Sequence, residues 1–534
     1  MSSGGLGVVA RDDLYGFEQL GFSALGITLS SSHGYGKQIV RNDKEMDVVY
    51  PPNPTHKEEL VGYFYMELSG KRFRVNILEQ QDVARIHTRL IGLSTDIEEN
   101  PTDIRQITRV LYGGKHATGF AEDAWLKVCQ QAVLGIGGIF AMRTLGYEAE
   151  LFHMNESHGA FAQLFIYQEY LRQGFSPNIA LEKTIRRFVY TNHTPVEAGN
   201  PVHPYGVSVE ALSAYLDKGT FSQISGRTDS VPMTEIAFKL SRKWNGVADL
   251  HATVIREMYH RPEILGIRNG IYIPVWQMPE YRDMKNPNEI PEIKRYYKEI
   301  VYREAVRRAR ECGLTANDHV SLDEFLNAYP SLMFARRWAG YKRMQMMAYS
   351  NERAFFDNFL KWGKMSLVWG GSPHADDTDR RTDWNAMLAD VRHLPNVLTF
   401  LNYDPWAMRY LKASADLWFN FMWYGREACG TSWMSTMINC GLNVSVLDGG
   451  VPEASKYVIG FGSTSLGKWE EQYDFDASDL WRKLSTEVLP RFWRKDPTLY
   501  EFLFEAKTWA EENLSVIPTC KRYIMELYEM DLPS

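Results

Sequence analysis

Short runs of β-branched and aromatic residues alternate with longer helical segments along most of this 534-residue chain. The runs have the length and apolar content of buried strands, and they cover residues 22–29, 73–79, 187–193, 331–336, 364–371, 396–402, 415–421 and 443–448. Helices are expected at 121–146, 159–174 and 235–259. Strands that alternate with helices form parallel sheets with helices on their faces, so the pattern predicts an α/β fold.

The chain is longer than a single hydrophobic core normally supports, so about two or three domains are expected. Residues 1–272 are predicted to form a first Rossmann-like domain, which ends in the segment GIRNGIYIPVW. A passage rich in proline and charge follows, and residues 273–496 are predicted to form a second Rossmann-like domain. Residues 497–534 are predicted to form helices that return to the first domain.

Charge and composition exclude several classes of protein. The net charge of −7 provides no basic surface for nucleic acid or an anionic membrane. The N-terminus lacks the basic and apolar pattern of a secretion signal, and no long uninterrupted apolar run predicts a membrane-spanning helix. The five cysteines are scattered without a paired motif, which favours free thiols in a reducing compartment. We therefore expect a cytoplasmic protein without a metal site.

A cluster of cations follows one of the predicted buried strands. The segment FARRWAGYKR carries Arg336, Arg337, Lys342 and Arg343 at a strand-to-helix junction. Cations at the start of a helix oppose the helix dipole, and a bound anion relieves that conflict. The cluster therefore predicts a phosphate or diphosphate site, and an exposed, charged helix start is the alternative.

Polar motifs end two strands in the first half of the chain. HMNESHGAF at 153–161 offers Asn155 and His158 as hydrogen-bond partners for sugar hydroxyls, or it forms a strand-to-helix turn capped by Asn155 or Ser157. TNHTPVEAG carries His193 directly after an apolar strand. Ligands of open α/β sheets bind at the carboxyl ends of strands, but Pro195 also explains why this strand ends.

Glycine-rich segments are weaker signals. GGLG at Gly4 to Gly7 predicts a loop whose backbone N–H groups approach a phosphate, and a flexible N-terminus is the alternative. GGSPHADD at 370–377 follows another apolar strand and predicts either a ligand-facing loop or a simple turn.

Read in order, these segments resemble the α-glucan phosphorylases of the short archaeal and bacterial type. The matching segments are GGLGVVARD, LYGG at 111–114, LGIGG, HMNESHGAF, TNHTPVEAG, LSRKWNGVADLH, IRNGIYIPVW, FARRWAGYKR, GGSPHADD, ADLWFN and EACGTS. They extend from Gly4 to about residue 465. The resemblance implies a GT-B fold, in which two Rossmann-like domains face each other across a cleft and C-terminal helices cross back. A homodimer is also possible on this resemblance.

The resemblance also implies roles for individual residues. The backbone carbonyl of His193 would lie near the anomeric carbon, Arg337 and Lys342 would hold the substrate phosphate, and Glu427 would bind sugar hydroxyls. The other residues expected to bind substrate are Gly5, Leu6, Gly7, Asn155, His158, Asn269, Tyr403, Trp423, Tyr424, Gly430, Thr431 and Ser432. Of these, Gly430 to Ser432 would meet the phosphate that pyridoxal phosphate supplies in true phosphorylases.

One position departs sharply from the family. The signature E-A-[SC]-G-T-[SG]-x-M-K ends in the lysine that forms the Schiff base with pyridoxal phosphate, and this chain has Ser435 there. A serine hydroxyl cannot form an imine. Trp433 is also bulky where the family has a small residue. We therefore expect no cofactor and treat pyridoxal phosphate as doubtful.

These observations leave three functional hypotheses. The leading one is a retaining glycosyltransferase that moves a hexosyl group from a nucleotide sugar to an unidentified acceptor, because the donor's diphosphate could replace the two phosphates of a phosphorylase site. The first alternative is an α-glucan phosphorylase that binds pyridoxal phosphate without a covalent bond. The second is a non-catalytic relative that binds a sugar phosphate or a glucan.

Overall fold

The computed structural model describes residues 4–33, 36–52, 58–80, 86–110, 124–196, 199–344, 346, 360, 363–465 and 469–533. The LYGG motif at 111–114 lies outside the described residues, as do residues 197–198 of TNHTPVEAG. The chain divides into two compact units. Unit 1 comprises Met1–Gly36, Tyr50–Arg268 and Ile517–Ser534, and unit 2 comprises Lys37–Val49 and Asn269–Val516. The domain boundaries that the sequence predicts, after residues 272 and 496, remain predictions.

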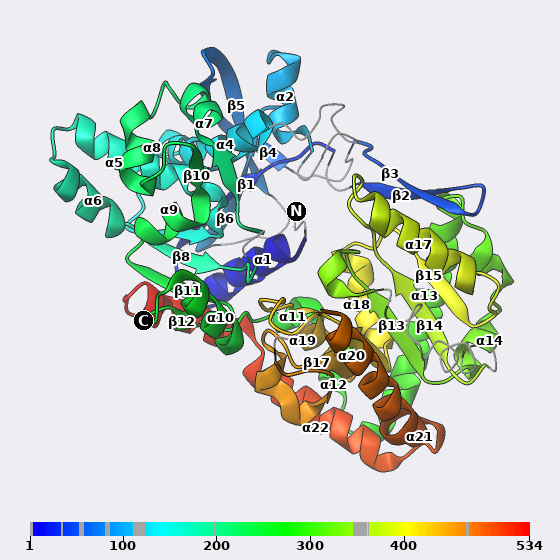
Figure 1. Cartoon of the computed structure of the whole chain (residues 1–534). Helices are drawn as coiled ribbons and strands as arrows, with labels where there is room; N and C mark the ends of the chain where they lie inside the picture. The colour runs from blue at the N-terminus through cyan, green and yellow to red at the C-terminus, as the bar shows by residue number, and fades with distance from the viewer. Residues whose placement is uncertain are drawn as a thin grey trace. The chain divides into compact units, whose positions relative to one another are not determined.

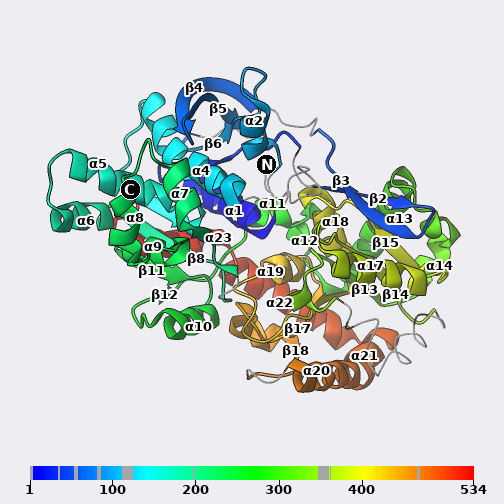
Figure 2. The ribbon, with the colours of Figure 1, turned by 45° about the horizontal axis from the view of Figure 1, so that its top comes forward.

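Unit 1 contains two four-stranded sheets. The first has the order β1-β6-β5-β4, in which β1 (Ala24–Leu29) runs parallel to β6 (Thr88–Ser94), and β5 (Lys71–Gln80) and β4 (Glu58–Leu68) form an antiparallel hairpin. Figure 2 shows this hairpin as a curved blue ribbon. The second sheet is parallel throughout, in the order β12-β11-β8-β7, and its strands are β12 (Leu265–Gly266), β11 (Lys243–Gly246), β8 (Phe188–Asn192) and β7 (Phe152–Asn155).

Helix α4 (Ala124–Thr144) lies in the core of unit 1 and packs against β1, β4, β6 and α5. It is long and apolar enough to cross a membrane by length and composition, but 72% of its apolar window is buried inside the protein, as in a core helix. A Cβ atom on Gly135 would lie 2.8 Å from the carbonyl oxygen of Gly159. The LGIGG motif therefore allows α4 to approach the HMNESHGAF turn closely.

The remaining helices of unit 1 surround these sheets. They are α1 (Gly4–Gln19), α2 (Thr102–Arg109), α5 (Phe161–Arg172), α6 (Pro177–Ile185), α7 (Tyr205–Ala211), α8 (Lys218–Ser225), α9 (Met233–Lys239), α10 (Asp249–Tyr259) and α23 (Val516–Arg522). A short antiparallel pair, β9 (Val202–Pro204) and β10 (Ser230–Pro232), joins them.

Two local predictions for unit 1 are wrong. The helix expected at 235–259 is interrupted by β11, because Lys243–Gly246 pairs with β8 in the parallel sheet. A tertiary pairing partner overrides local helix preference there. The glycines at Gly4 to Gly7 form the first turn of α1 rather than a loop.

Unit 2 is built on a six-stranded parallel sheet in the order β15-β14-β13-β16-β17-β18. This is the 3-2-1-4-5-6 order of the doubly wound Rossmann fold. The strands are β13 (Ser331–Ala335), β14 (Ser366–Gly370), β15 (Val397–Phe400), β16 (Leu417–Asn420), β17 (Leu442–Val446) and β18 (Val458–Phe461). The direction of strand addition reverses between β13 and β16, where such folds bind their ligands.

Helices cover this sheet, as Figure 1 shows. The described helices of unit 2 are α11 (Ile273–Trp276), α12 (Pro279–Asp283), α13 (Ile290–Glu311), α14 (Leu322–Asn327), α17 (Thr378–Val391), α18 (Pro405–Ser414), α19 (Ser432–Met437), α20 (Trp469–Lys483), α21 (Leu489–Trp493) and α22 (Pro497–Asn513), and of these α13, α18, α19 and α20 contact the strands. An antiparallel ribbon of β2 (Lys37–Arg41) and β3 (Glu45–Val49) also belongs to unit 2, although it comes from the N-terminal part of the chain. It lies beside α17, where the Asn385 side chain accepts the Met46 backbone N–H at 2.9 Å.

The last residues of the chain belong to unit 1. The Thr519 hydroxyl donates to the backbone carbonyl of Arg268 at 2.9 Å, and Lys243 pairs with Glu529 at 2.7 Å. The Tyr528 hydroxyl lies 2.7 Å from His153 Nδ1. These contacts attach the C-terminal segment to the parallel sheet of unit 1.

Candidate functional site

In unit 2, the predicted site residues gather at the switch point of the sheet. Arg336 directly follows β13, and its guanidinium donates to the backbone carbonyl of Phe419 at 3.0 Å and to the side chain of Asn420 at the end of β16. Burial lowers the Arg336 pKa from its ordinary value, while the nearby Glu427 carboxylate opposes that effect. Arg336 therefore joins the carboxyl ends of the two strands that flank the switch point.

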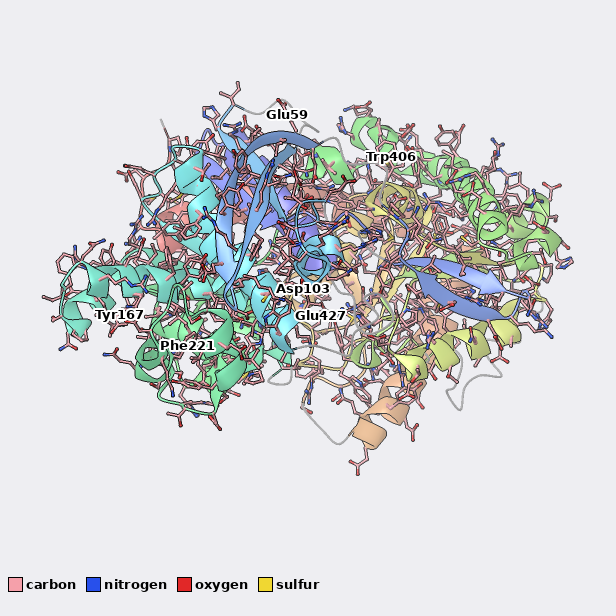
Figure 3. The ribbon with its side chains drawn as sticks, turned by 90° about the horizontal axis from the view of Figure 1, so that it is seen from above. Glu59, Asp103, Tyr167, Phe221, Trp406 and Glu427 are labelled. Atoms are coloured by element: carbon pink, nitrogen blue, oxygen red, sulfur yellow. The ribbon has the colours of Figure 1, made fainter. Side chains whose placement is uncertain are left out.

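Arg337 and Lys342 differ in their surroundings. Arg337 is exposed, and it makes no hydrogen bond or ion pair within the part of the chain that the structure describes. Lys342 Nζ lies 3.2 Å from Glu427 Oε2, and both side chains are largely buried. Glu427 is labelled in Figure 3. The described geometry thus leaves the Arg337 guanidinium available to an anion, whereas Lys342 already has a carboxylate partner.

The sequence placed Arg343 in the cation cluster, but the structure gives it a structural role instead. Its side chain is fully buried, pairs with Asp476 at 2.7 Å and donates to the Met422 carbonyl at 2.7 Å. The guanidinium also lies 4.4 Å from the centroid of the Trp423 ring. All three guanidinium nitrogens thus donate to protein groups.

Backbone contacts fix the loop that carries Glu427. Asp448 Oδ2 accepts the backbone N–H groups of Arg426 at 3.0 Å and Glu427 at 2.8 Å. Burial raises the Asp448 pKa to about 6. Sequence reasoning missed Asp448 as a site residue, although its place at the polar end of the predicted strand run 443–448 could have drawn attention to it.

Asn269 faces the same loop. Its Nδ2 donates to the Cys429 carbonyl at 3.2 Å, while its buried Oδ1 has no hydrogen-bond partner among the described residues. A buried amide oxygen without a partner is costly, so it marks a position where a ligand hydroxyl could donate. This observation fits the predicted sugar-binding role.

Aromatic residues border the cation cluster. Tyr403 follows β15, and burial raises its pKa to about 12. Trp423 is buried, and its backbone N–H donates to the Tyr341 carbonyl at 3.2 Å. Tyr424 is half-buried, and its pKa is raised by burial and by the Asp448 carboxylate.

The GTSWMS segment forms the start of α19. Gly430, Thr431 and Ser432 are half-buried, whereas Ser435 is fully buried inside the helix. Trp433 is also fully buried, and its indole Nε1 has no hydrogen-bond partner among the described residues. The bulky side chain noted in the sequence is thus part of the core of unit 2.

In unit 1, Glu156 organises a second group of the residues singled out in the sequence. It stands between β7 and α5 with a positive φ of 70° and is 2% exposed. Its carboxylate accepts the His193 backbone N–H at 2.6 Å and the Thr194 hydroxyl at 2.9 Å. It also accepts the Ser157 backbone N–H at 3.1 Å, so Glu156 caps this turn and not Asn155 or Ser157 as expected.

His193 lies next to Asn155, with Nε2 and Oδ1 2.5 Å apart. Desolvation lowers the His193 pKa to about 4, so the imidazole is neutral at physiological pH. Asn155 is exposed and His158 is half-buried. Gly5 is exposed and Leu6 and Gly7 are half-buried in the first turn of α1.

Ser435 cannot form an imine with pyridoxal phosphate, but side chains next to it in unit 2 are compatible with this cofactor. Lys412 supplies a buried primary amine in contact with Ser435. Trp276 and Trp418 present their rings to that amine, and the buried Trp418 Nε1 has no hydrogen-bond partner among the described residues. An amine, aromatic faces and an unused N–H group suit an aromatic aldehyde. Among the described residues, no cluster of His, Cys, Asp and Glu could hold a metal ion.

No protein-family model matches the chain. A maltodextrin phosphorylase of Thermococcus litoralis is 26% identical, and the alignment covers 99% of this chain and 69% of that protein. The chain is a relative of the α-glucan phosphorylases. A glycogen phosphorylase of Mycobacterium tuberculosis is 26% identical over 92% of this chain and 64% of that protein, and one of Aquifex aeolicus is 25% identical over 92% and 78%. The chain thus spans about two thirds to three quarters of the length of these relatives.

This kinship corrects the leading functional hypothesis. We expected a transferase that uses a nucleotide sugar, because Ser435 removes the cofactor lysine. The relatives that align along the whole chain are named as maltodextrin and glycogen phosphorylases, so the nucleotide-sugar hypothesis is wrong. The loss of one lysine was too narrow a basis for a change of donor.

Proposed function

We propose that this α-glucan phosphorylase relative catalyses phosphorolysis, in which inorganic phosphate removes a terminal glucosyl unit from an α-glucan as glucose 1-phosphate. Its two units are assigned to the two Rossmann-like halves of a GT-B fold. The substrates are thus a glucan and phosphate, as the names of the relatives suggest.

The observation that carries the proposal is the group of charges at the switch point of unit 2. The Arg337 guanidinium is exposed, and Lys342 and Glu427 form a largely buried pair at 3.2 Å. Arg337 binds the incoming phosphate, because a planar guanidinium donates two parallel hydrogen bonds to an oxyanion. Lys342 holds the Glu427 carboxylate in place, and Glu427 accepts hydrogen bonds from sugar hydroxyls.

Other residues orient the sugar. Asn269 Oδ1, which has no hydrogen-bond partner among the described residues, accepts a hydrogen bond from a sugar hydroxyl. In unit 1, Glu156 holds the His193 backbone, and the neutral imidazole next to Asn155 offers a further polar contact. Fixed dipoles of this kind stabilise positive charge that develops at the anomeric carbon. Pyridoxal phosphate, when bound, supplies a second phosphate beside the substrate phosphate.

The test is an assay for glucose 1-phosphate with maltodextrin and inorganic phosphate, run with and without added pyridoxal phosphate. We expect release that depends on both glucan and phosphate and that increases with the cofactor. If maltodextrin binds but no glucose 1-phosphate forms under any condition, the protein is a non-catalytic relative that binds glucan, and the proposal fails.

A further inference from the structure

Position 435 lacks an amine, but the structure places one beside it. Lys412 on α18 donates a hydrogen bond from Nζ to Ser435 Oγ on α19 at 2.5 Å. The two helices pack against each other. Lys412 is 4% exposed and Ser435 is 1% exposed. A buried primary amine therefore reaches the side chain that stands where the family has its cofactor lysine.

Aromatic rings surround this amine. Lys412 Nζ lies 4.7 Å from the centroid of the Trp276 ring and 5.9 Å from that of the Trp418 ring. The Trp418 Nε1 is buried and has no hydrogen-bond partner among the described residues. An indole N–H that is removed from water without a hydrogen-bond partner is unfavourable, so the Trp418 N–H favours a ligand that accepts from it beside the amine.

The Ser435 hydroxyl is oriented to accept from the amine. Its own proton is directed at the helix carbonyls of Thr431 at 3.1 Å and Ser432 at 3.2 Å. A hydroxyl has one proton and two lone pairs, so its lone pairs are left for Lys412. Ser435 thus holds the amine in place instead of supplying one.

Lys294, Lys298 and Lys507, the other buried lysines among the described residues of unit 2, are bound differently, and Lys507 pairs with Glu511 at 2.7 Å. Lys294 donates to the backbone carbonyls of Ala413 at 3.1 Å and Ala415 at 2.7 Å. Lys298 forms a buried ion pair with Asp416 at 2.5 Å. The amines of Lys294 and Lys298 link structural elements, whereas Lys412 is directed at the position of the missing lysine.

We propose that Lys412 replaces the missing lysine and forms the imine with pyridoxal phosphate. This inference rests on the proposed phosphorylase function, because that reaction is the one that uses the cofactor. The lone pair of Lys412 Nζ attacks the aldehyde carbon, and a carbon–nitrogen bond forms. The aldehyde oxygen leaves as water with both protons of the neutral amine, and the imine nitrogen takes one further proton from solvent, so no oxidant or reductant is needed. Ser435 Oγ accepts the hydrogen bond of the protonated imine.

Reduction and peptide mapping test this proposal. The full chain is incubated with pyridoxal phosphate, its absorbance spectrum is recorded, and borohydride then fixes any imine as a stable amine. We expect a pyridoxyl group on Lys412, which also blocks tryptic cleavage after that residue. Lys412→Met loses the label, and the exposed Lys364→Met keeps it. In Lys412→Met with Ser435→Lys, the label moves to position 435.

The outcomes separate this inference from the proposed function. A label on a different lysine, bound cofactor that is released after reduction, or no cofactor binding at all overturns the role of Lys412. Mapping of the unmutated chain decides this even if Lys412→Met does not fold, as checked by thermal unfolding. Phosphorolysis without a label on Lys412 refutes only the inference. A label on Lys412 without glucose 1-phosphate release refutes only the proposed function.

Discussion

Lys342 Nζ lies 3.2 Å from Glu427 Oε2, and the two side chains are only 16% and 13% exposed. Each charge partly neutralises the other, so an anion that approaches this pair meets little net charge. Arg337, five residues earlier in the chain, is exposed and has no such partner among the described residues. Among the described residues of this region, the charges of Lys342 and Glu427 thus balance each other, whereas the exposed guanidinium of Arg337 can bind an anion.

The first prediction concerns this guanidinium. Arg337→Ala should lower kcat/KM for phosphate by about 10- to 100-fold, because a hydrogen bond to a charged group contributes ~1.5–3 kcal/mol. The KM for glucan should change little. Initial rates at varied phosphate concentration measure the effect. Arg303→Ala removes an exposed arginine of α13 and is the matched control; equal losses in both variants would contradict the role of Arg337.

The second prediction concerns Glu156 as a positioning residue. Glu156→Gln keeps the size of the side chain but replaces one acceptor oxygen with a donor, so the backbone N–H of Ser157 or His193 loses its partner. We expect a loss of about 1.5–3 kcal/mol in the free energy of unfolding. We also expect a lower kcat with little change in KM for phosphate, since His193 is displaced and the proposed phosphate-binding residue Arg337 belongs to unit 2. Glu169→Gln, in a surface pair with Arg143, should leave both quantities unchanged.

The third prediction concerns the loop after β14. Gly371 has a φ of 116°, and a Cβ atom there would lie 1.7 Å from the Arg336 carbonyl oxygen. Gly371→Ala should therefore destabilise the protein by at least about 1–3 kcal/mol through backbone strain and should displace Arg336. Chemical denaturation measures the loss. At Gly340 a Cβ atom meets open space, so Gly340→Ala should be nearly neutral, and similar effects of the two substitutions would count against this explanation.

The fourth prediction concerns pH. Desolvation is the largest cause of the lowered pKa of four histidines of unit 1, to about 4 for His153, His193 and His203 and to about 3 for His251. The unfolded chain binds these protons near the ordinary pKa of 6.5, above the folded pKa. Stability is therefore full above pH 6.5 and is lost as the pH falls from 6.5 to 4. Denaturant unfolding at pH 7 and pH 5 measures the loss.

A variant assigns part of that slope to one residue. His251 is buried, and its Nδ1 accepts the Val247 backbone N–H at 3.1 Å. His251→Gln keeps an acceptor but removes the titrating ring, so stability should depend less on pH between 4 and 6.5. An unchanged dependence would show that His251 does not titrate as its burial implies.

Local pattern was sufficient for eight of the strands, but it missed others such as β4 and β6. The runs at 331–336 and 415–421 became β13 and β16, because apolar β-branched and aromatic residues favour buried strands wherever they pack. The motif that contains Glu427 indicated a relative of the phosphorylases. Local pattern failed at 235–259, where helical periodicity conceals β11. The pairing of β11 with β8 depends on a strand about fifty residues away.

The sequence by itself determined which residue types are present: an α/β chain, a cluster of cations and a serine in place of the cofactor lysine. Only the tertiary structure decided which of them act together. It buried Arg343 against Asp476, left Arg337 exposed, and brought the Lys412 amine to Ser435. The reason is that periodicity and turn residues encode contacts a few residues apart. Contacts such as Lys412–Ser435 depend on how α18 packs against α19, and no local pattern specifies that packing.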